Sequence, residues 1–381
     1  MSWPTVAIGD ISNLVTKGTT PTTMGRPFTD HGVRFVKAEA LNGDTYLEQS
    51  GVAFIEEETH QMLKRSILEK DDVLITIAGA QIGRCGYVTS EDLPANTNQA
   101  VGIVRINREK AVPRFVYYFF KQPGTFQTIQ SIGGGQAAQP NLNLANLKQI
   151  ALRLPSMREQ QIIASSLSAY DDVIENNRRR MSLLEASARL LYSEWFVRLR
   201  FPGHEHTSIA DGVPEGWERK ALGECITLNY GKALKAEVRI DGEYPVYGSS
   251  GIVGSHEKPL VKGPAIVLGR KGNVGSVYWS SKSFYPIDTV YFVDAESSSL
   301  YLYYALKHMH FISTDVAVPG LNRDFAYSRL LLLPPTTLLC AFLETVTPIH
   351  AQLDKLDEMN QKLRAACGLL LPRLMSGEIT V

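Results

Sequence analysis

The feature that most constrains this 381-residue chain is an ordered series of motifs that occurs twice. The segment Trp3–Ile11 recurs as Trp217–Ile226, with tryptophan, alanine, an aliphatic residue, glycine and an acid in register. Four further pairs follow in the same order: LITIAGAQIG with IVLGRKGNVG, FVYYFF with YLYYAL, QPNLN with VPGLN, and two aliphatic runs that end at Pro155 and Pro334. One match could arise by chance, but five in one order indicate an internal duplication.

Each copy has the pattern of a mixed module, with short β-branched or aromatic runs between Gly, Pro and Asn turns. The FVYYFF and YLYYAL segments are compatible with helices, and we interpret their tyrosines as core residues. After each copy the apolar period changes from 2 to 3.5. We therefore expect an α/β (α+β) two-repeat protein, with globular modules at residues 1–155 and 201–335 and long helices at residues 156–200 and 336–381.

Both predicted helices carry an apolar seam whose members alternate steps of four and three, which is typical of a left-handed coiled coil. The first seam is Ile163, Leu167, Tyr170, Ile174, Asn177, Met181, Leu184, Ala188, Leu191 and Trp195. The second is Phe342, Val346, Ile349, Leu353, Leu356, Asn360, Leu363, Cys367, Leu370 and Leu374. A helix of about 40 residues would be about 60 Å long.

One asparagine near the middle of each seam indicates the orientation of the helices. In an antiparallel pair with aligned centres, Asn177 faces Asn360. In a parallel pair in the repeat register, Asn177 would face Leu356 and Asn360 would face Met181, so each amide would lack its partner at a cost of about 1–3 kcal/mol. A paired amide can also specify register. We therefore predict an antiparallel pair in which Asn177 and Asn360 meet.

An antiparallel pair of similar helices predicts a pseudo-two-fold axis, with the two modules at opposite ends of a rod. This geometry suits a target in two parts along a duplex. A structural dimer with a stiff spacer is the alternative, and the pattern alone does not separate the two interpretations.

The charge of the chain is balanced, with 39 Lys and Arg residues against 39 Asp and Glu residues. A protein that holds DNA alone usually shows a basic excess. Any affinity for DNA must therefore come from local basic loops, or be shared with a partner.

The cysteines, histidines and apolar runs favour a cytoplasmic protein without a metal site. Cys85, Cys225, Cys340 and Cys367 have the spacing of neither a zinc site nor a disulfide framework, and we interpret them as free thiols of a reducing compartment. The close histidine pairs lack a third ligand. We also expect no membrane span and no signal peptide, because no apolar run approaches about 20 residues and the first residues lack the leader pattern.

Polar loops rich in glycine are the candidate DNA contacts of the first module. Small hydroxyls and backbone amides are typical phosphate contacts, whereas Gln and Arg can pair with adenine and guanine in the major groove. The candidates are Lys17, Gly18, Thr19 and Thr20 in one loop, Lys37, then Gln81 and Arg84 after an apolar strand, then Asn98 and Gln99, and finally Gln136 in a glycine run.

The second module repeats the scheme, and its Gly269–Gly275 loop is the most basic glycine loop of the chain. That loop lacks the Gly-Lys-Ser/Thr end of a P-loop. The candidates here are Lys232, Tyr247, Ser249, Arg270, Lys271, Asn273, Asn322 and Arg323. For any of these loops, a bare turn is the alternative interpretation. For the run Arg178–Arg180 within the first helix, the alternatives are a solvated face, DNA lying along the helix or a docked partner.

The sequence shows no catalytic constellation. We find neither the glycine-rich methyl-donor loop nor the Asn/Asp-Pro-Pro-aromatic motif of an amino-methyltransferase, since Leu333-Pro334-Pro335-Thr336 lacks the acid or amide and the aromatic residue. No cluster of carboxylates with a lysine indicates a metal-dependent nuclease. A self-sufficient enzyme is therefore the weaker alternative, and a coiled-coil scaffold that binds only proteins is another.

The whole chain resembles the specificity subunit (HsdS) of type I restriction-modification systems. PSMREQQIIASSL, which starts at Pro155, is similar to the start of the family's conserved helix, and EGWERKALGE, from Glu215, is similar to the opening of its second module. The final LLLPRLMSGEITV resembles the family's usual ending. The second helix departs from the pattern, because Pro335-Thr336-Thr337-Leu338 contains no Glu-Gln pair.

The resemblance implies two target recognition domains, each of which reads half of a bipartite site in double-stranded DNA. The helices would set the distance between the half-sites and dock two DNA methyltransferase (HsdM) subunits, and endonuclease/translocase (HsdR) subunits would join for restriction. It also implies that S-adenosylmethionine, Mg²⁺ and ATP bind only to those partners, and that this chain is a non-catalytic subunit. Enclosure of the DNA by the partners would account for the neutral charge.

Overall fold

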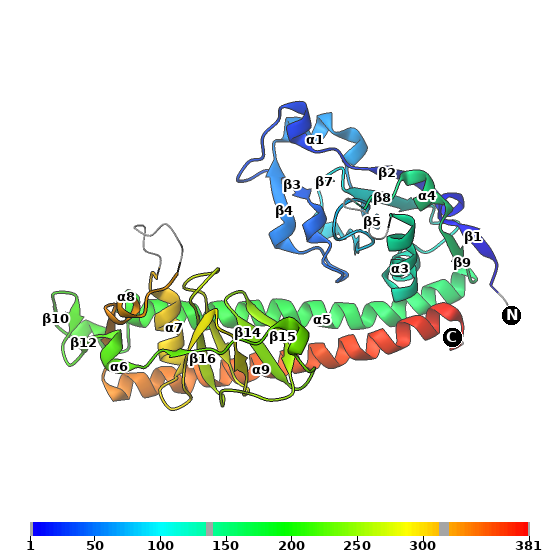
Figure 1. The fold of residues 1–381 in the computed structure, drawn as a ribbon. Coiled ribbons are helices and arrows are strands. Elements are labelled where there is room, and N and C mark those ends of the chain that lie inside the picture. The colour runs from blue at the N-terminus through cyan, green and yellow to red at the C-terminus, as the bar shows by residue number, and fades with distance from the viewer. Residues whose placement is uncertain (1–2, 135–139, 312–319, 380–381) are drawn as a thin grey trace. The chain divides into compact units, whose positions relative to one another are not determined.

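The computed structural model describes residues 3–134, 140–311 and 320–379, and it forms two compact units (Figure 1). One unit contains Met1–Asn177 together with Met359–Val381, and the other contains Arg178–Glu358. Each unit therefore combines one module with a segment of both long helices. The boundaries of these two units differ from those of the four segments expected from the sequence, because each module packs against both helices.

The first unit contains the strands β1 (Thr5–Ala7), β2 (Ser12–Lys17), β3 (Val33–Val36), β4 (Val52–Ile55), β5 (Val73–Thr76), β6 (Cys85–Tyr87), β7 (Ala95–Thr97), β8 (Val101–Ile106) and β9 (Ala151–Arg153). Its short helices are α1 (Glu57–Met62), α2 (Pro113–Lys121), α3 (Pro123–Ile132) and α4 (Leu144–Gln149). The two long helices, α5 (Met157–Tyr192) and α9 (Thr336–Ser376), contribute to both units.

The second unit contains the strands β10 (Ile209–Ala210), β11 (Val213–Pro214), β12 (Glu218–Ala221), β13 (Asn229–Tyr230), β14 (Tyr244–Gly248), β15 (Gly251–His256), β16 (Ala265–Gly269), β17 (Val277–Ser280), β18 (Tyr285–Pro286), β19 (Val290–Val293) and β20 (Leu330–Leu333). Its short helices are α6 (Leu222–Cys225), α7 (Leu300–His308) and α8 (Arg323–Tyr327). The mixture of helices and strands agrees with the α+β class expected from the sequence.

The two modules share one topology. The four-stranded sheets have the orders β2-β8-β5-β6 and β13-β19-β16-β17, and the three-stranded sheets have the orders β4-β3-β7 and β15-β14-β18. In each three-stranded sheet one pair is antiparallel and the other is parallel. A two-stranded sheet, β1-β9 or β12-β20, joins the start of each module to its end. The matched motifs of the sequence are therefore matched elements of a duplicated fold.

Aromatic residues of α2 and α7 form the centres of the two cores. Tyr117 and Tyr118 are fully buried in the first unit, and Tyr303 and Tyr304 are buried in the second, as expected from the sequence. Burial of large aromatic side chains dominates the energetics of a core. These cores hold the four-stranded sheets, and thus the loops at the sheet ends, against the long helices.

In the first unit, α5 and α9 run antiparallel. Ile163 and Leu167, near the start of α5, are buried in one cluster with Leu371 and other residues near the end of α9. Further along α5, Asn177 Nδ2 donates a hydrogen bond of 2.9 Å to Asn360 Oδ1, and both residues are almost fully buried. The structure thus places the two amides together, as the antiparallel register requires.

In the second unit, the last part of the first seam is not α-helical. Residues Ser193–Val197 form a π-helical turn after α5. The rings of Tyr192 and Trp195 lie 6.2 and 6.1 Å from that of Phe342 on α9. The expected helix 156–200 therefore ends earlier than its apolar pattern suggested, because the wider turn accommodates large aromatic side chains at this end.

The Glu-Gln pair at the start of α5 fastens that helix to its module. Glu159 Oε2 accepts hydrogen bonds from the Ser156 N–H and hydroxyl at 2.9 and 2.7 Å. The buried Gln160 accepts from the Val112 N–H, at 2.8 Å, just before α2. Leu339 stands near the start of α9 and packs against the apolar core of the second unit. At the position where α5 has the polar contact of Gln160, α9 therefore has the apolar contact of Leu339.

Candidate nucleic-acid interface

In each four-stranded sheet, three neighbouring strands begin or end at the same edge of the sheet. The loops connected to these strands lie together at that edge. In the second module, Tyr230 pairs with Tyr291 and Gly269 pairs with Val290. The segments after β13, before β19 and after β16 therefore lie side by side. In the first module, Lys17 pairs with Gly102 and Thr76 pairs with Val101, which gives the same arrangement.

A glycine at each of these sheet ends allows two backbones to approach closely. The Gly18 N–H donates to the Val101 carbonyl at 3.1 Å, and a Cβ on Gly18 would lie 2.1 Å from the Thr97 oxygen. The equivalent Gly231 N–H donates to the Val290 carbonyl at 3.2 Å, and a Cβ there would lie 2.0 Å from the Ile287 oxygen. Both contacts forbid a side chain, so Gly18 builds its loop rather than offering a functional group.

In the second module these loops bring four candidate cations to the same end of the sheet. The guanidinium groups of Arg270 and Arg323 lie 5.1 and 5.5 Å from the ring centre of Tyr230, whose side chain is half exposed. Lys271 and Lys232 are exposed in the adjoining loops. We call Tyr230, Lys232, Arg270, Lys271 and Arg323 the Tyr230 cluster.

Backbone hydrogen bonds hold the loops of the Tyr230 cluster together. The Leu321 N–H donates to the Arg270 carbonyl at 2.8 Å, and Lys271 forms a β-bridge with Gly320. The Asn322 side chain caps α8, because its Oδ1 accepts from the Asp324 N–H at 2.7 Å. Asn322 therefore orients Arg323, the first residue of α8.

The positive charge of this cluster is not compensated by acidic side chains. Within the described parts of the chain, none of its four cations forms an ion pair. Arg270 Nη2 donates to the Asp288 carbonyl at 2.8 Å, whereas its buried Nε has no hydrogen-bond partner there. Burial raises the pKa of Tyr291 to about 12, so this neutral tyrosine donates a 3.1 Å hydrogen bond to the Leu321 carbonyl. The arrangement is suited to binding an anion such as a phosphate.

Two candidate DNA contacts of the second module instead have structural roles. Tyr247 is buried, and its ring lies 5.4 Å from that of Phe284, so the expected surface contact is replaced by core packing. Burial also raises the pKa of Tyr247. Ser249 is buried as well: its hydroxyl accepts from the Asn273 N–H at 3.4 Å, and its carbonyl accepts from the Ser276 hydroxyl at 2.6 Å. Ser249 thus shapes the basic loop, and the side chain of Asn273 is exposed on it.

In the first module, the loop after β2 meets an arginine that sequence analysis missed. Lys17 is exposed at the end of the strand, and Thr20 is half-buried at the start of a short 3₁₀ turn. Arg65 Nη2 donates to Thr19 Oγ1 at 3.3 Å. Arg65 is 46 residues away along the chain, so no local pattern links it to this loop.

The loop after β5 is a tight turn built on glycines with positive φ. Gly79 and Gly83 have φ values of 93° and 89°. The Gly83 N–H donates to the Thr76 carbonyl at 2.8 Å. Gln81 and Arg84 are half-buried in this turn, and Arg84 forms no ion pair among the described residues.

The segment before β8 contains both buried and exposed polar side chains. Asn96 and Thr97 are fully buried: Asn96 Nδ2 donates to the Leu63 carbonyl at 3.2 Å, and the Thr97 hydroxyl donates to the Val36 carbonyl at 2.8 Å. Asn96 and Thr97 therefore have structural roles. Gln99 is exposed, whereas Asn98 Oδ1 accepts from the Ala100 N–H at 3.2 Å.

The two remaining candidates of the first module are Lys37, at the end of β3, and Gln136. The Lys37 ammonium lies 4.8 Å from the ring centre of Phe28. Gln136 falls outside the described residues. Because Val36 pairs with Thr97, Lys37 lies beside the start of the Asn98–Gln99 loop.

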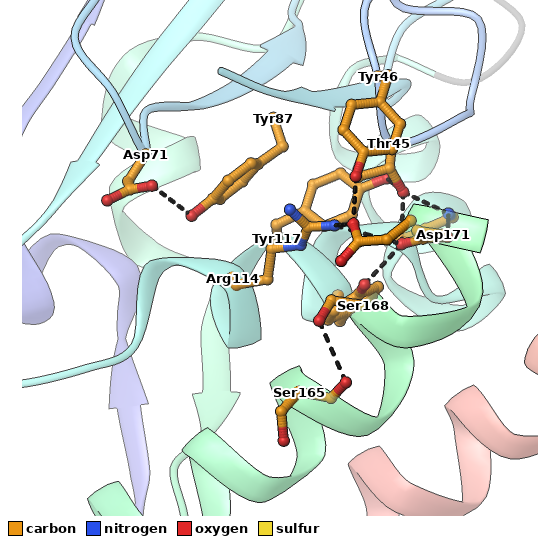
Figure 2. Close-up of polar contacts among 12 residues, drawn as sticks. Thr45, Tyr46, Asp71, Tyr87, Arg114, Tyr117, Ser165, Ser168 and Asp171 are labelled. Atoms are coloured by element: carbon orange, nitrogen blue, oxygen red, sulfur yellow. Dashed lines mark hydrogen bonds and ion pairs between the residues drawn. The ribbon is translucent and has the colours of Figure 1, made fainter. Parts of the chain in front are cut away.

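A buried carboxylate fixes the first module on α5 (Figure 2). Asp171 Oδ2 accepts hydrogen bonds from the Thr45 hydroxyl at 2.7 Å and from the Tyr118 hydroxyl at 2.5 Å, and the Lys121 ammonium lies 3.4 Å from its Oδ1. Burial and the negative charge of Asp171 raise the pKa of Tyr118, which keeps that hydroxyl a donor. The cluster joins a loop of the module, α2 and α5, and so positions the sheet and its loops on the helix.

In the second unit, His350 on α9 performs the equivalent attachment. Its Nε2 lies 2.8 Å from the Tyr304 hydroxyl. Burial lowers the pKa of His350 to about 4, so the imidazole is neutral near pH 7. Lys307, which matches Lys121, instead pairs with Glu185 on α5 at 2.7 Å. The duplication therefore conserves the attachment while its chemistry differs.

The described parts of the chain hold no group of three or more His, Cys, Asp or Glu residues able to bind a metal ion. All four cysteines are free thiols. Across the same residues, none of the helices has the combination of length and apolarity needed to cross a bilayer.

Comparisons with known proteins agree with the duplicated fold. Residues 2–186 and 214–325, more than half of the chain, match the family model described as type I restriction modification DNA specificity domain. The chain is 24% identical to the type I restriction enzyme MjaIX specificity subunit of Methanocaldococcus jannaschii, over 100% of this chain and 94% of that protein. It is 31% identical to the EcoBI specificity subunit of Escherichia coli over 43% of this chain and 36% of that protein.

A solved structure, the type I restriction-modification S subunit from M. genitalium, has the same fold. It superposes with a TM-score of 0.59 and 17% identity, over 98% of this chain and 96% of that one. A duplicated α+β protein with basic loops at its sheet ends is thus a DNA-recognition component of a restriction system. The chain belongs to the type I restriction-modification specificity family, whose members are non-catalytic subunits, with methyltransferase and endonuclease activities on other subunits.

Proposed function

We propose that each module of this chain binds one half of a bipartite target in double-stranded DNA. The two modules have the same topology, and in each of them three loops meet at one end of a four-stranded sheet. Two similar binding surfaces on one chain suit two half-sites. The antiparallel direction of α5 and α9 supports a pseudo-two-fold relation between the modules, with the helices as a spacer that sets the distance between the half-sites.

The observation that carries this proposal is the Tyr230 cluster. A chain with 39 basic and 39 acidic residues has no general attraction for DNA, yet four cations meet here without ion pairs among the described residues. Phosphate contacts of this kind supply much of the affinity for DNA and make it salt-dependent. Arginine beside an exposed aromatic ring also presents a planar group that can pair bidentately with guanine.

The loops of the first module are assigned to the other half-site. Lys17, Thr19, Thr20, Gln81, Arg84, Asn98 and Gln99 are its candidate contacts. Partner subunits would supply further electrostatic contacts to the DNA at this half-site as well.

The partners proposed for the chain are two DNA methyltransferase subunits docked along the helices, with endonuclease/translocase subunits joining for restriction. S-adenosylmethionine, Mg²⁺ and ATP would bind to those subunits, and a cytoplasmic location follows from action on the chromosome. Enclosure of the duplex by the methyltransferase subunits accounts for a specificity subunit without a basic excess.

A gel shift with a pool of random duplexes tests the proposal, with and without the methyltransferase subunit of the same system. We expect enrichment of duplexes that carry two fixed half-sites at one separation. Enrichment of a single continuous site would contradict the bipartite target. The absence of any sequence preference in both conditions would favour a scaffold that binds only proteins.

A further inference from the structure

Strand β9 has one edge that no other strand covers. The Ile8 N–H donates to the Ile150 carbonyl at 3.0 Å, and the Leu154 N–H donates to the Pro4 carbonyl at 2.8 Å. In an antiparallel ladder with this register, the backbone groups of Leu152 face β1, whereas those of Ala151 and Arg153 face away. Within the described chain, these outward N–H and C=O groups meet no hydrogen-bond partner. Such an edge is a template for an added strand.

The open edge of β9 faces a groove. A cavity of about 950 Å³ lies between β9, α3, α4 and the end of α9, all within the first unit. Its lining includes Ala151 and Arg153 together with Thr128, Asn146 and Met375. A strand added to β9 would lie about 4.8 Å from it. The groove therefore leaves space for a short extended peptide where the unpaired backbone groups point.

The equivalent edge in the second module is covered in part. The matching strand β20 pairs with β12, and the outward carbonyl of Leu332 accepts a hydrogen bond from the Tyr301 hydroxyl. In the matched motifs FVYYFF and YLYYAL, Phe115 stands in the place of Tyr301. Phenylalanine has no hydroxyl group, so it cannot satisfy the carbonyl of Arg153. The second module thus covers one outward carbonyl that the first module leaves open, whereas the outward backbone groups of Leu330 meet no hydrogen-bond partner among the described residues.

The lining of the groove indicates which kind of segment fits. Among the described residues, Arg153 is its one charged member, and Gln122, Thr125, Thr128, Asn146 and Gln149 offer amides and hydroxyls. A groove with one cation and no acid is complementary to a segment that carries a carboxylate.

We propose that the groove beside β9 binds an extended, carboxylate-bearing segment of the methyltransferase subunit, which adds a strand to the β1-β9 sheet. The identity of the partner rests on the proposed function.

Hydrogen exchange at single-residue resolution tests the added strand. The full chain is compared alone and in complex with the purified methyltransferase subunit, without DNA. We expect exchange at the Ala151 and Arg153 N–H groups to slow by about tenfold or more in the complex, because both groups gain hydrogen bonds. The Leu152 N–H already faces β1, so its exchange should not change. Equal protection of all three residues, or of none, would overturn the proposal.

Variants of the groove provide a second measurement. Thr128→Trp fills the groove from the exposed face of α3, and Arg153→Glu reverses its charge. Each should weaken binding of the methyltransferase subunit by about tenfold. The control Lys70→Glu makes the same charge change at an exposed position just before β5, outside the groove and off the long helices, and should leave binding within about twofold.

The possible failures are distinguishable. If the methyltransferase subunit binds the chain but neither variant weakens binding, the groove is not its docking site, and the proposed function is unaffected. If the subunit does not bind at all, the inference is also overturned, and the gel shift of the chain alone still tests DNA recognition.

Discussion

At the scale of single residues, some side chains of the Tyr230 cluster hold its loops in place, whereas others contribute only positive charge. Arg270 bonds the Asp288 carbonyl and packs on Tyr230, so its replacement would disturb the loop as well as remove a charge. Lys271 is exposed, and its side chain forms no ion pair within the described chain. Lys271 is therefore the better probe of a phosphate contact.

Lys271→Ala is expected to weaken DNA binding and to reduce the slope of log K against log [salt] by about 0.9, the contribution of one phosphate contact. Titrations at several salt concentrations measure this slope. Lys262→Ala is the matched control, because Lys262 is exposed just before β16, at the opposite end of that strand from Gly269. An unchanged slope for Lys271→Ala, or an equal change for both variants, would show that this loop is not at the phosphates.

His350 makes the stability of the second unit depend on pH. Burial lowers its pKa in the folded state to about 4 from an ordinary value of 6.5, with Glu185 acting in the opposite direction. Between these values the unfolded chain binds a proton that the folded chain does not. This contribution therefore destabilises the fold progressively as the pH falls from about 6.5 to about 4.

Denaturant unfolding at pH 7.5 and pH 5 should show a larger loss of stability in the wild type than in His350→Gln. The amide keeps a polar group near the Tyr304 hydroxyl but takes up no proton. His206→Gln, at an exposed position, should behave as the wild type does. Identical pH dependence in wild type and His350→Gln would contradict the role of burial at this histidine.

At the scale of the elements, the long helices are best specified by the sequence. A repeat of 3.5 residues over more than four heptads predicted α5 and α9, and the two seam asparagines predicted their antiparallel register, because a buried amide strongly favours an amide partner. The π-helical turn at Ser193–Val197 was not predictable, since the apolar seam extends into it as far as Trp195 without a change of spacing.

The short strands and loops are specified less well. Tyr247 adjoins Gly248 and Asn96 lies in a polar run, as exposed candidates do, yet both residues are buried. Strands of two to five residues are too short for alternation to show which side chain faces inward. The contacts of Arg65 with Thr19 and of Arg323 with Tyr230 join segments that are distant in sequence, so only the fold reveals them.

The amide pair provides a test of the helix register. Asn177→Leu or Asn360→Leu alone removes one partner of a buried 2.9 Å hydrogen bond and should cost about 1–3 kcal/mol of unfolding free energy. The double variant replaces both amides by apolar groups and should recover most of that loss. Denaturant unfolding of the four proteins gives the coupling energy. Strictly additive losses would mean that the two amides do not act as a pair.

At the scale of the whole molecule, the duplication makes the two modules independent in what they read. Each has its own core and its own set of loops, and the aromatic residues that fill one core are not shared with the other. A change in the loops of one module should therefore leave the sequence preference of the other intact, since mutations at distant sites without shared partners act additively.

This independence predicts how the methylated sequence responds to substitution. In cells that carry the complete system, Arg323→Ala should relax or change the bases in one half of the methylated motif, because a lost base contact costs about 1–3 kcal/mol at its position. Gln81→Ala should change only the other half. Sequencing of methylated adenines across the genome reads both halves at once, and the separation between them should stay constant in both variants. A change in both halves caused by either variant would contradict the assignment of one half-site to each module.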